Sequence, residues 1–235
     1  DGVEHFFVRH LSISHYGVNV DIISQEADLE GYDIVVAPAM YVRSQKAVRQ
    51  LHDFASRGGI VLLTTRSGVK DEHNNCIMRP LPTDYADMTG CVVEEYDATG
   101  TDKIMITMDG EDYMGTHWCD VIRTEGAEIL AVYKENFYAG RPAVTQNAYG
   151  KGIVYYVGTV GLPALCRRLA ERTLQQAGIS YITDLPERVE VTTRDKEGRQ
   201  FIFVFNNDGT AKNFLFEGEQ IELAPFEMKR FEKAL

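Results

Sequence analysis

The chain has 235 residues, of which 44% are hydrophobic and 25% are charged, fractions that are ordinary for a globular protein. Its 24 basic and 35 acidic residues give a net charge of −11, which argues against nucleic acid or an anionic membrane surface as a partner, because both are bound through basic residues. No stretch approaches the roughly 20 uninterrupted apolar residues of a membrane-spanning helix. The length accommodates one large domain, or a medium and a small one.

Helical and extended patterns alternate in the first part of the chain. Phe6, Phe7, His10 and Leu11 recur at helical spacing, which predicts an opening helix that ends near Gly17. The elements predicted next are a strand over 18–23, a strand over 33–38, a helix over 44–57 followed by a Gly-Gly pair, and a strand over 60–64. The short apolar runs are typical of parallel strands that are covered on both faces. The sequence therefore predicts an open α/β sheet.

The order of these elements carries a further expectation. Open α/β domains normally begin with a strand, whereas this chain begins in a predicted helix and without an initiator Met. We therefore expect the first strand of the domain to lie upstream, and the chain to be a fragment of a longer protein.

The middle of the chain changes from loop to strand patterns. A polar, irregular stretch over 66–82 predicts a long loop of the kind that has a function or forms an interface. A later helix is predicted to contain Pro163 in its first turn and to end at Gly178. Between the loop and this helix, strands are predicted over 91–96, 103–107, 129–133, 143–145 and 153–157.

The last part of the chain is predicted to be all β. It follows a predicted linker at 183–186 and shows no helical period. Five short strands are predicted, over 189–192, 201–205, 213–216, 221–223 and 228–231, and turn sequences separate them. Such a set predicts a small antiparallel sandwich or barrel.

Few residues stand out as carriers of chemistry. Ser67 follows a buried strand, but a nucleophile elbow requires a glycine two residues before the serine, where this chain has Thr65. The four cysteines, at 76, 91, 119 and 166, lack the short spacing of zinc ligands, so we expect no metal site. Glycosidases use two carboxylates that face each other, and no pattern in this chain singles out such a pair.

Five strings, in order along the chain, resemble the C-terminal half of glycoside hydrolase family 42 β-galactosidases. Together they span roughly residues 10–205 and are far more specific than any one alone. The strings are 26–39 (EADLEGYDIVVAPA), 66–72 (RSGVKDE), 118–122 (WCDVI) with 125–127 (EGA), 137–145 (FYAGRPAVT) and 150–159 (GKGIVYYVGT).

The resemblance implies a fold and a place in a larger enzyme. In that family an N-terminal (β/α)₈ barrel carries both catalytic glutamates. A three-layer α/β trimerisation domain of flavodoxin-like or class I glutamine amidotransferase-like fold follows, and then a small antiparallel β-domain. The resemblance maps residues 1–182 onto the trimerisation domain and 186–235 onto the β-domain, and no part of this chain matches the barrel. Where the amidotransferase-like fold presents a cysteine nucleophile, this chain reads TTRSG at 64–68.

The function implied by this resemblance is assembly. The fragment is expected to have no catalytic residues and no cofactor. Its parent is expected to hydrolyse terminal β-D-galactosyl bonds in the cytoplasm of a bacterium. The expected partners are further copies of the chain, in a homotrimer, and the catalytic barrel of the parent, which binds the galactoside.

The loop at 66–72 and the segment at 137–141 are predicted to contact a barrel or a neighbouring subunit. Interfaces are enriched in aromatic residues and arginine, and a solvent-facing loop gains little from them. The predicted contact residues are Arg66, Ser67, Asp71, Glu72, Trp118, Phe137, Tyr138 and Arg141.

Two alternatives from other functional classes remain open. One is a free-standing amidotransferase-like hydrolase that uses Ser67, and the other is a carbohydrate-binding module, for which Trp118 is a residue that could stack on a sugar. A hydrolase requires a base beside its nucleophile, and a binding module requires galactoside affinity in the isolated chain.

Overall fold

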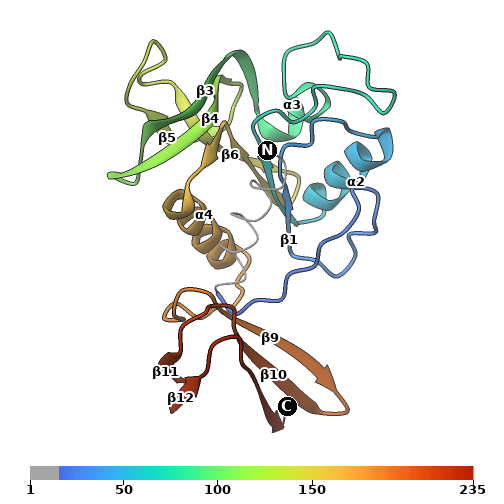
Figure 1. The fold of residues 1–235 in the computed structure, drawn as a ribbon. Coiled ribbons are helices and arrows are strands. Elements are labelled where there is room, and N and C mark those ends of the chain that lie inside the picture. Colours follow the sequence, from blue (N-terminus) through green and yellow to red (C-terminus); the bar gives the residue numbers. More distant parts are fainter. Residues whose placement is uncertain (1–15, 235) are drawn as a thin grey trace. The chain divides into compact units, whose positions relative to one another are not determined.

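The computed structural model of the chain describes residues 16–234 (Figure 1). These residues form two compact units. The larger unit comprises residues 23–177, and the smaller one comprises residues 16–22 and 178–234.

The larger unit is built on one mixed sheet. Within the described residues the sheet has eight strands in the order β1-β2-β7-β6-β5-β3-β4-β8. The first three strands in this order, β1 (Ile34–Ala37), β2 (Ile60–Thr64) and β7 (Gly152–Val157), pair in parallel. The other pairs are antiparallel and involve β3 (Cys91–Met108), β4 (Glu111–Thr124), β5 (Glu128–Tyr133), β6 (Pro142–Tyr149) and β8 (Thr159–Gly161).

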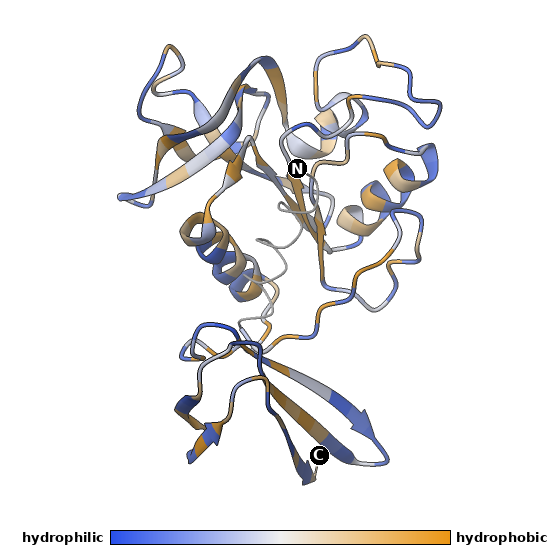
Figure 2. Cartoon of the chain, viewed as in Figure 1, coloured by the Kyte–Doolittle hydropathy of each residue, from blue (hydrophilic) through white to orange (hydrophobic). Residues whose placement is uncertain are grey.

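Helices cover both faces of this sheet. Helices α2 (Gln45–Ser56) and α3 (Ala86–Thr89) lie on one side and α4 (Pro163–Gln176) lies on the other (Figure 1). Because side chains alternate along a strand, Ile60 and Leu62 of β2 pack in one core cluster with α4, and Val61 and Leu63 pack in the other with α2 and α3. All five residues of β2 are buried, and Figure 2 shows the central strands as apolar. The predicted three-layer α/β domain is confirmed.

Helix α2 forms where the sequence predicts it, for two local reasons. The Ser44 hydroxyl accepts a hydrogen bond from the backbone N–H of Ala47 at 3.1 Å, and so caps the first turn. Val48, Leu51 and Phe54 recur at helical spacing and are buried against the sheet.

The smaller unit is antiparallel, as predicted. A three-stranded sheet has the order β13-β10-β9, and a hairpin pairs β11 with β12. Val191, Ile202 and Val204 of the sheet share a core with Phe214 and Leu223 of the hairpin. The strands are β9 (Val189–Lys196), β10 (Arg199–Asn206), β11 (Lys212–Phe216), β12 (Glu219–Leu223) and β13 (Met228–Ala234).

Three expectations about local structure need comment. The prediction of a strand over 18–23 is wrong, because this segment pairs with no strand and Ile22 is 67% exposed. The Asn19 side chain instead bonds Thr193: its Oδ1 accepts from the Thr193 backbone N–H at 2.9 Å, and its amide nitrogen donates to the Thr193 hydroxyl at 3.1 Å. The strands predicted over 91–96 and 103–107 are one irregular strand, β3, and β4 was not predicted. The predicted opening helix lies almost wholly outside the described residues.

In the part of the chain that the structure describes, no helix is long and apolar enough to cross a membrane.

Candidate assembly surface

The loop that follows β2 runs beside the connection from β1 to α2, at the carboxyl end of the parallel strands. The backbone N–H of Gly68 bonds the Met40 carbonyl at 2.9 Å, and that of Lys70 bonds the Tyr41 carbonyl at 2.8 Å. The backbone N–H of Arg43 in turn bonds the Lys70 carbonyl at 3.0 Å. Open α/β sheets place their binding and catalytic sites at this edge, and the backbone hydrogen bonds fix the conformation of the loop there.

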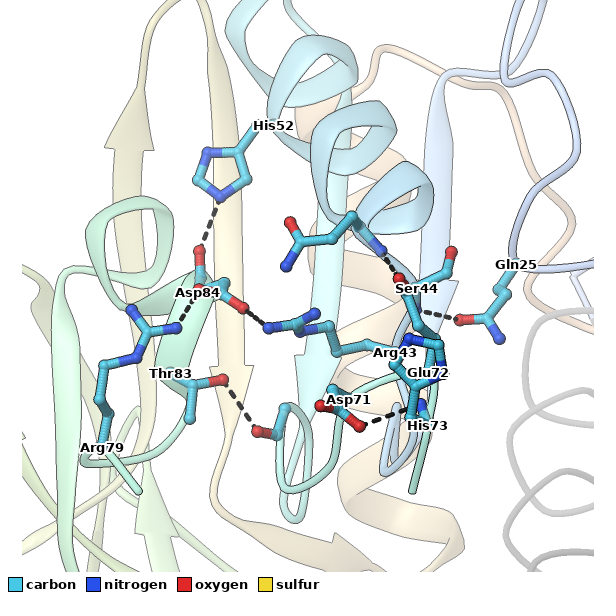
Figure 3. Close-up of polar contacts among 12 residues, drawn as sticks. Gln25, Arg43, Ser44, His52, Asp71, Glu72, His73, Arg79, Thr83 and Asp84 are labelled. Carbon is cyan, nitrogen blue, oxygen red and sulfur yellow. Dashed lines mark hydrogen bonds and ion pairs between the residues drawn. The ribbon is translucent and has the colours of Figure 1, made fainter. Parts of the chain in front are cut away.

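A buried ion pair holds the far end of this loop (Figure 3). Arg43, only 3% exposed, pairs with Asp84, which lies in the short 3₁₀ helix η1 (Thr83–Tyr85). Asp84 also pairs with the more exposed Arg79, and its backbone carbonyl lies 2.9 Å from Nε2 of His52. The pair therefore joins the start of α2 to the end of the loop.

Ser67 lies inside this loop and is fully buried. Its hydroxyl donates a hydrogen bond to the Thr64 carbonyl at 2.7 Å and accepts one from the Met40 backbone N–H at 3.2 Å. The hydroxyl hydrogen is therefore directed at a backbone carbonyl, and no basic side chain receives it. This is the arrangement of a residue that stabilises a turn.

Asp71 and Glu72 order the loop and the helix beside it (Figure 3). Oδ1 of Asp71 accepts hydrogen bonds from the backbone N–H groups of His73 and Asn75, both at 2.9 Å. The bond from the Asn75 backbone is the main cause that lowers the pKa of Asp71. Oε2 of Glu72 accepts from the backbone N–H of Gln45 at 2.9 Å, which satisfies a free donor at the amino end of α2.

Arg66 lies among three aromatic rings. The carbon of its guanidinium group is 4.3 Å from the ring centroid of Tyr96, 4.6 Å from that of Trp118 and 5.7 Å from that of Tyr41. Tyr96 is 50% exposed and Tyr41 38% exposed, so this group reaches the surface. We call these four residues the aromatic–arginine surface. Cation–π contacts of this kind are favourable, and the composition is that of an interface.

Tyr41 and Tyr96 are the two members of this surface that were not predicted. They are distant in sequence from Arg66 and Trp118, and only the folded sheet brings the four together. Their one sequence signal is that each is an aromatic residue close to a predicted strand.

The other predicted group, at 137–141, contacts the same strand, β3. Phe137 is 70% exposed, whereas Tyr138 is 1% exposed and donates a hydrogen bond to Oδ2 of Asp97 at 3.0 Å. The guanidinium group of Arg141 bonds Glu94 at 2.5 Å. Glu94 and Asp97 flank Tyr96 in β3, so the two predicted groups are connected through residues 94–97 of this strand.

One carboxylic acid, Asp120, lies in the interior behind the aromatic–arginine surface, in β4, and is fully buried. Its Oδ2 accepts a hydrogen bond from the Tyr156 hydroxyl at 2.7 Å. Burial raises the pKa of Asp120 to about 6, and the Tyr156 hydroxyl, Thr65 and Arg66 act in the opposite direction.

No group of three or more His, Cys, Asp or Glu side chains is placed to hold a metal ion within residues 16–234.

Comparisons with known proteins identify the family. Residues 3–180 match the family model described as the β-galactosidase trimerisation domain. The chain is 34% identical over 211 residues to β-galactosidase BgaA of Clostridium cellulovorans, an alignment that covers 89% of this chain and 32% of that protein. It is 36% identical over 194 residues to β-galactosidase BgaB of a Geobacillus species, covering 81% of this chain and 29% of that protein.

Solved structures agree with this assignment. The β-galactosidase from Bacillus circulans sp. alkalophilus superposes with a TM-score of 0.91 at 26% identity, over 100% of this chain and 38% of that one. The enzyme from Rahnella sp. R3 gives a TM-score of 0.89 at 27% identity, over 98% of this chain and 36% of that one. The chain spans about a third of the length of these relatives. It belongs to the trimerisation domain family of glycoside hydrolase family 42 β-galactosidases.

Proposed function

We propose that this chain holds together three copies of a β-galactosidase whose catalytic barrel lies in a part of the enzyme that these residues do not include. The observation that supports this most directly is the family match over residues 3–180, in a chain that covers only a third of its relatives. The described strands form an open sheet and two small antiparallel sheets, and none of these is a (β/α)₈ barrel. On this proposal the parent, in a bacterial cytoplasm, hydrolyses terminal β-D-galactosyl bonds.

The partners and domains that we propose follow from the same assignment. Residues 1–182 form the trimerisation domain and residues 186–235 form a separate β-domain. The trimerisation domain contacts further copies of itself and the barrel of the parent. The chain supplies no cofactor ligands and no catalytic residues.

We propose the aromatic–arginine surface as the centre of the contact between copies. Tyr, Trp and Arg contribute most often to the strongest contacts in protein interfaces. Phe137, Arg141, Asp71 and Glu72 are proposed to lie toward its rim. Ser67 and Tyr138, which are buried, are proposed to support it from inside the domain.

The hydrolase alternative has less support. A serine nucleophile needs a neighbouring base, and the Ser67 hydroxyl is bonded to backbone groups on both sides. The carbohydrate-binding alternative requires free aromatic faces, and Arg66 stacks on both Tyr96 and Trp118.

The surface can be tested by placing a charge at its centre. We expect Tyr96→Glu to weaken self-association by about 30-fold or more, because it removes from the centre of the contact an aromatic ring worth about 2 kcal/mol and neutralises the charge of Arg66 there. The matched control is Ile129→Glu, since Ile129 in β5 is 49% exposed, close to the 50% of Tyr96, and lies outside the proposed surface.

The measurement is the molar mass by light scattering over a range of concentration. Equal weakening by the two substitutions, or no effect of Tyr96→Glu on a trimer, would rule out this surface as the contact.

A further inference from the structure

Asp120 and Arg66 are brought together by the strand ends around them. The backbone N–H of Thr65 bonds the Val157 carbonyl, and that of Asp120 bonds the carbonyl of the next residue, Gly158, both at 2.7 Å. Asp120 therefore lies beside the residue that precedes Arg66. It is also the cross-strand partner of Tyr96 in the pairing of β3 with β4, and cross-strand partners share one face of a sheet.

The polar atoms of this region are buried and have few hydrogen bonds. Nε and Nη1 of Arg66 are buried without a hydrogen-bond partner, and Oδ1 of Asp120 is buried near the Thr65 side chain and the Arg66 backbone, both of which lower the Asp120 pKa. Aromatic rings lie against the guanidinium group of Arg66. The charge of Arg66 lowers the pKa of Asp120, as is expected where a buried cation and a buried anion stabilise each other.

We propose that Asp120 is the buried counter-charge that holds Arg66 between Tyr96 and Trp118, and so sets the shape of the surface at which copies meet. The positioning of Arg66 stands on the geometry of the single chain, and the effect on assembly rests on the function proposed above. Asp120 is a positioning residue, because it is fully buried and is proposed to act on the surface through Arg66.

Three titratable groups whose charges act on that of Asp120 keep one protonation state near neutral pH. They are Tyr156 of β7, Tyr133 of β5 and Cys91 of β3. Burial raises the pKa of Tyr156 and of Tyr133 well above the usual value, and raises that of Cys91 to about 11. An arginine side chain keeps its charge in proteins. Asp120 is therefore the member of this group whose charge changes between pH 5 and 8.

The fluorescence of Trp118 tests the positioning in the single chain. Trp118 is the only tryptophan of this 235-residue chain, and the guanidinium group of Arg66 lies 4.6 Å from its ring centroid. We expect the emission of the unmodified chain to change with a midpoint near the Asp120 pKa of about 6, as the carboxylate gains a proton and releases Arg66. The change should be absent in Asp120→Asn, and it should remain in His117→Asn, which removes the histidine next to Trp118.

The control is Asp112→Asn, which replaces an exposed carboxylate of the same strand. The pKa of Asp112 is lowered, mainly by the hydrogen bond from the Thr107 hydroxyl, so Asp112 does not titrate near pH 6. Asp112→Asn should therefore keep the pH-dependent change in emission. Tyr156→Phe is a second, milder variant. It removes the hydrogen bond that lowers the Asp120 pKa, so the midpoint should move to higher pH.

Assembly is measured separately, by light scattering at pH 7.5. We expect Asp120→Asn to weaken the trimer about tenfold, as coupled groups in one network commonly do. The positioning proposal is overturned if the unmodified chain shows no emission change between pH 5 and 8, or if Asp120→Asn keeps the change. A clear emission change in a chain that stays monomeric would instead overturn the assembly function and leave the positioning intact.

Discussion

Asp84→Ala is expected to lower the free energy of unfolding by about 3–5 kcal/mol. The substitution leaves the guanidinium group of Arg43 in the interior without its counter-charge, in a position where this residue is 3% exposed. A buried charge without a partner is costly because it has lost its water and gains nothing in return. The measurement is urea unfolding at pH 7.5, monitored by circular dichroism.

Arg79→Ala is the control for this prediction. Arg79 pairs with the same carboxylate, but its side chain is 56% exposed, so removing it should cost less than about 1 kcal/mol. Equal losses in the two variants would contradict the view that burial of Arg43 determines the effect. A loss below about 1 kcal/mol for Asp84→Ala would show that the pair does not hold the loop to the start of α2.

The second large effect is a dependence of stability on pH. The folded protein raises the pKa of Asp120 from 3.8 to about 6, so between these values the folded state holds a proton that the unfolded state has lost. Stability should therefore fall as the pH rises from about 4 to about 6, and stay constant above that range. A shift of this size corresponds to about 3 kcal/mol.

The comparison that isolates this effect is between the unmodified chain and Asp120→Asn, by urea unfolding from pH 4 to pH 8. Carboxylates with lowered pKa values, such as Glu94 and Asp112, act in the opposite direction, but at lower pH and equally in both proteins. The difference in unfolding free energy between the two proteins should change by about 3 kcal/mol across this range. A difference that is independent of pH would contradict the raised pKa.

The elements that could be predicted from the sequence are those that local patterns determine. Helix α2 has its N-terminal cap at Ser44 and an apolar stripe that includes Leu51. Strand β2 is a continuous apolar run, as expected of a strand that is covered on both faces of the sheet. The strands of the smaller unit are separated by turn residues such as Gly198 and Gly218. In each case the pattern and the tertiary structure favour the same local conformation.

The elements that were predicted wrongly or missed depend on tertiary pairing. The 18–23 segment has an alternating pattern, but a strand also needs a partner strand, and here the backbone N–H of Thr193 donates to the Asn19 side chain. Strand β4 contains Gly115 and the left-handed His117, which obscure its period. It is recognised only from its pairing with β3.

The candidate site could be predicted only in part, because its members come from different strands. Arg66 and Trp118 were identified through the resemblance and the composition of interfaces, whereas the contact of Arg66 with Tyr96 depends on how β3 pairs with β4. The same holds for Asp120. Its sequence neighbourhood gives no sign that it is fully buried beside Thr65 and Tyr156.

The central claim is that these residues hold copies of the chain together, and the solution mass of the purified, unmodified chain tests it most directly. Light scattering over a hundredfold range of concentration at pH 7.5 should give three times the mass of the single chain at high concentration, with dissociation only on dilution. The mass of a single chain at every concentration would contradict the claim.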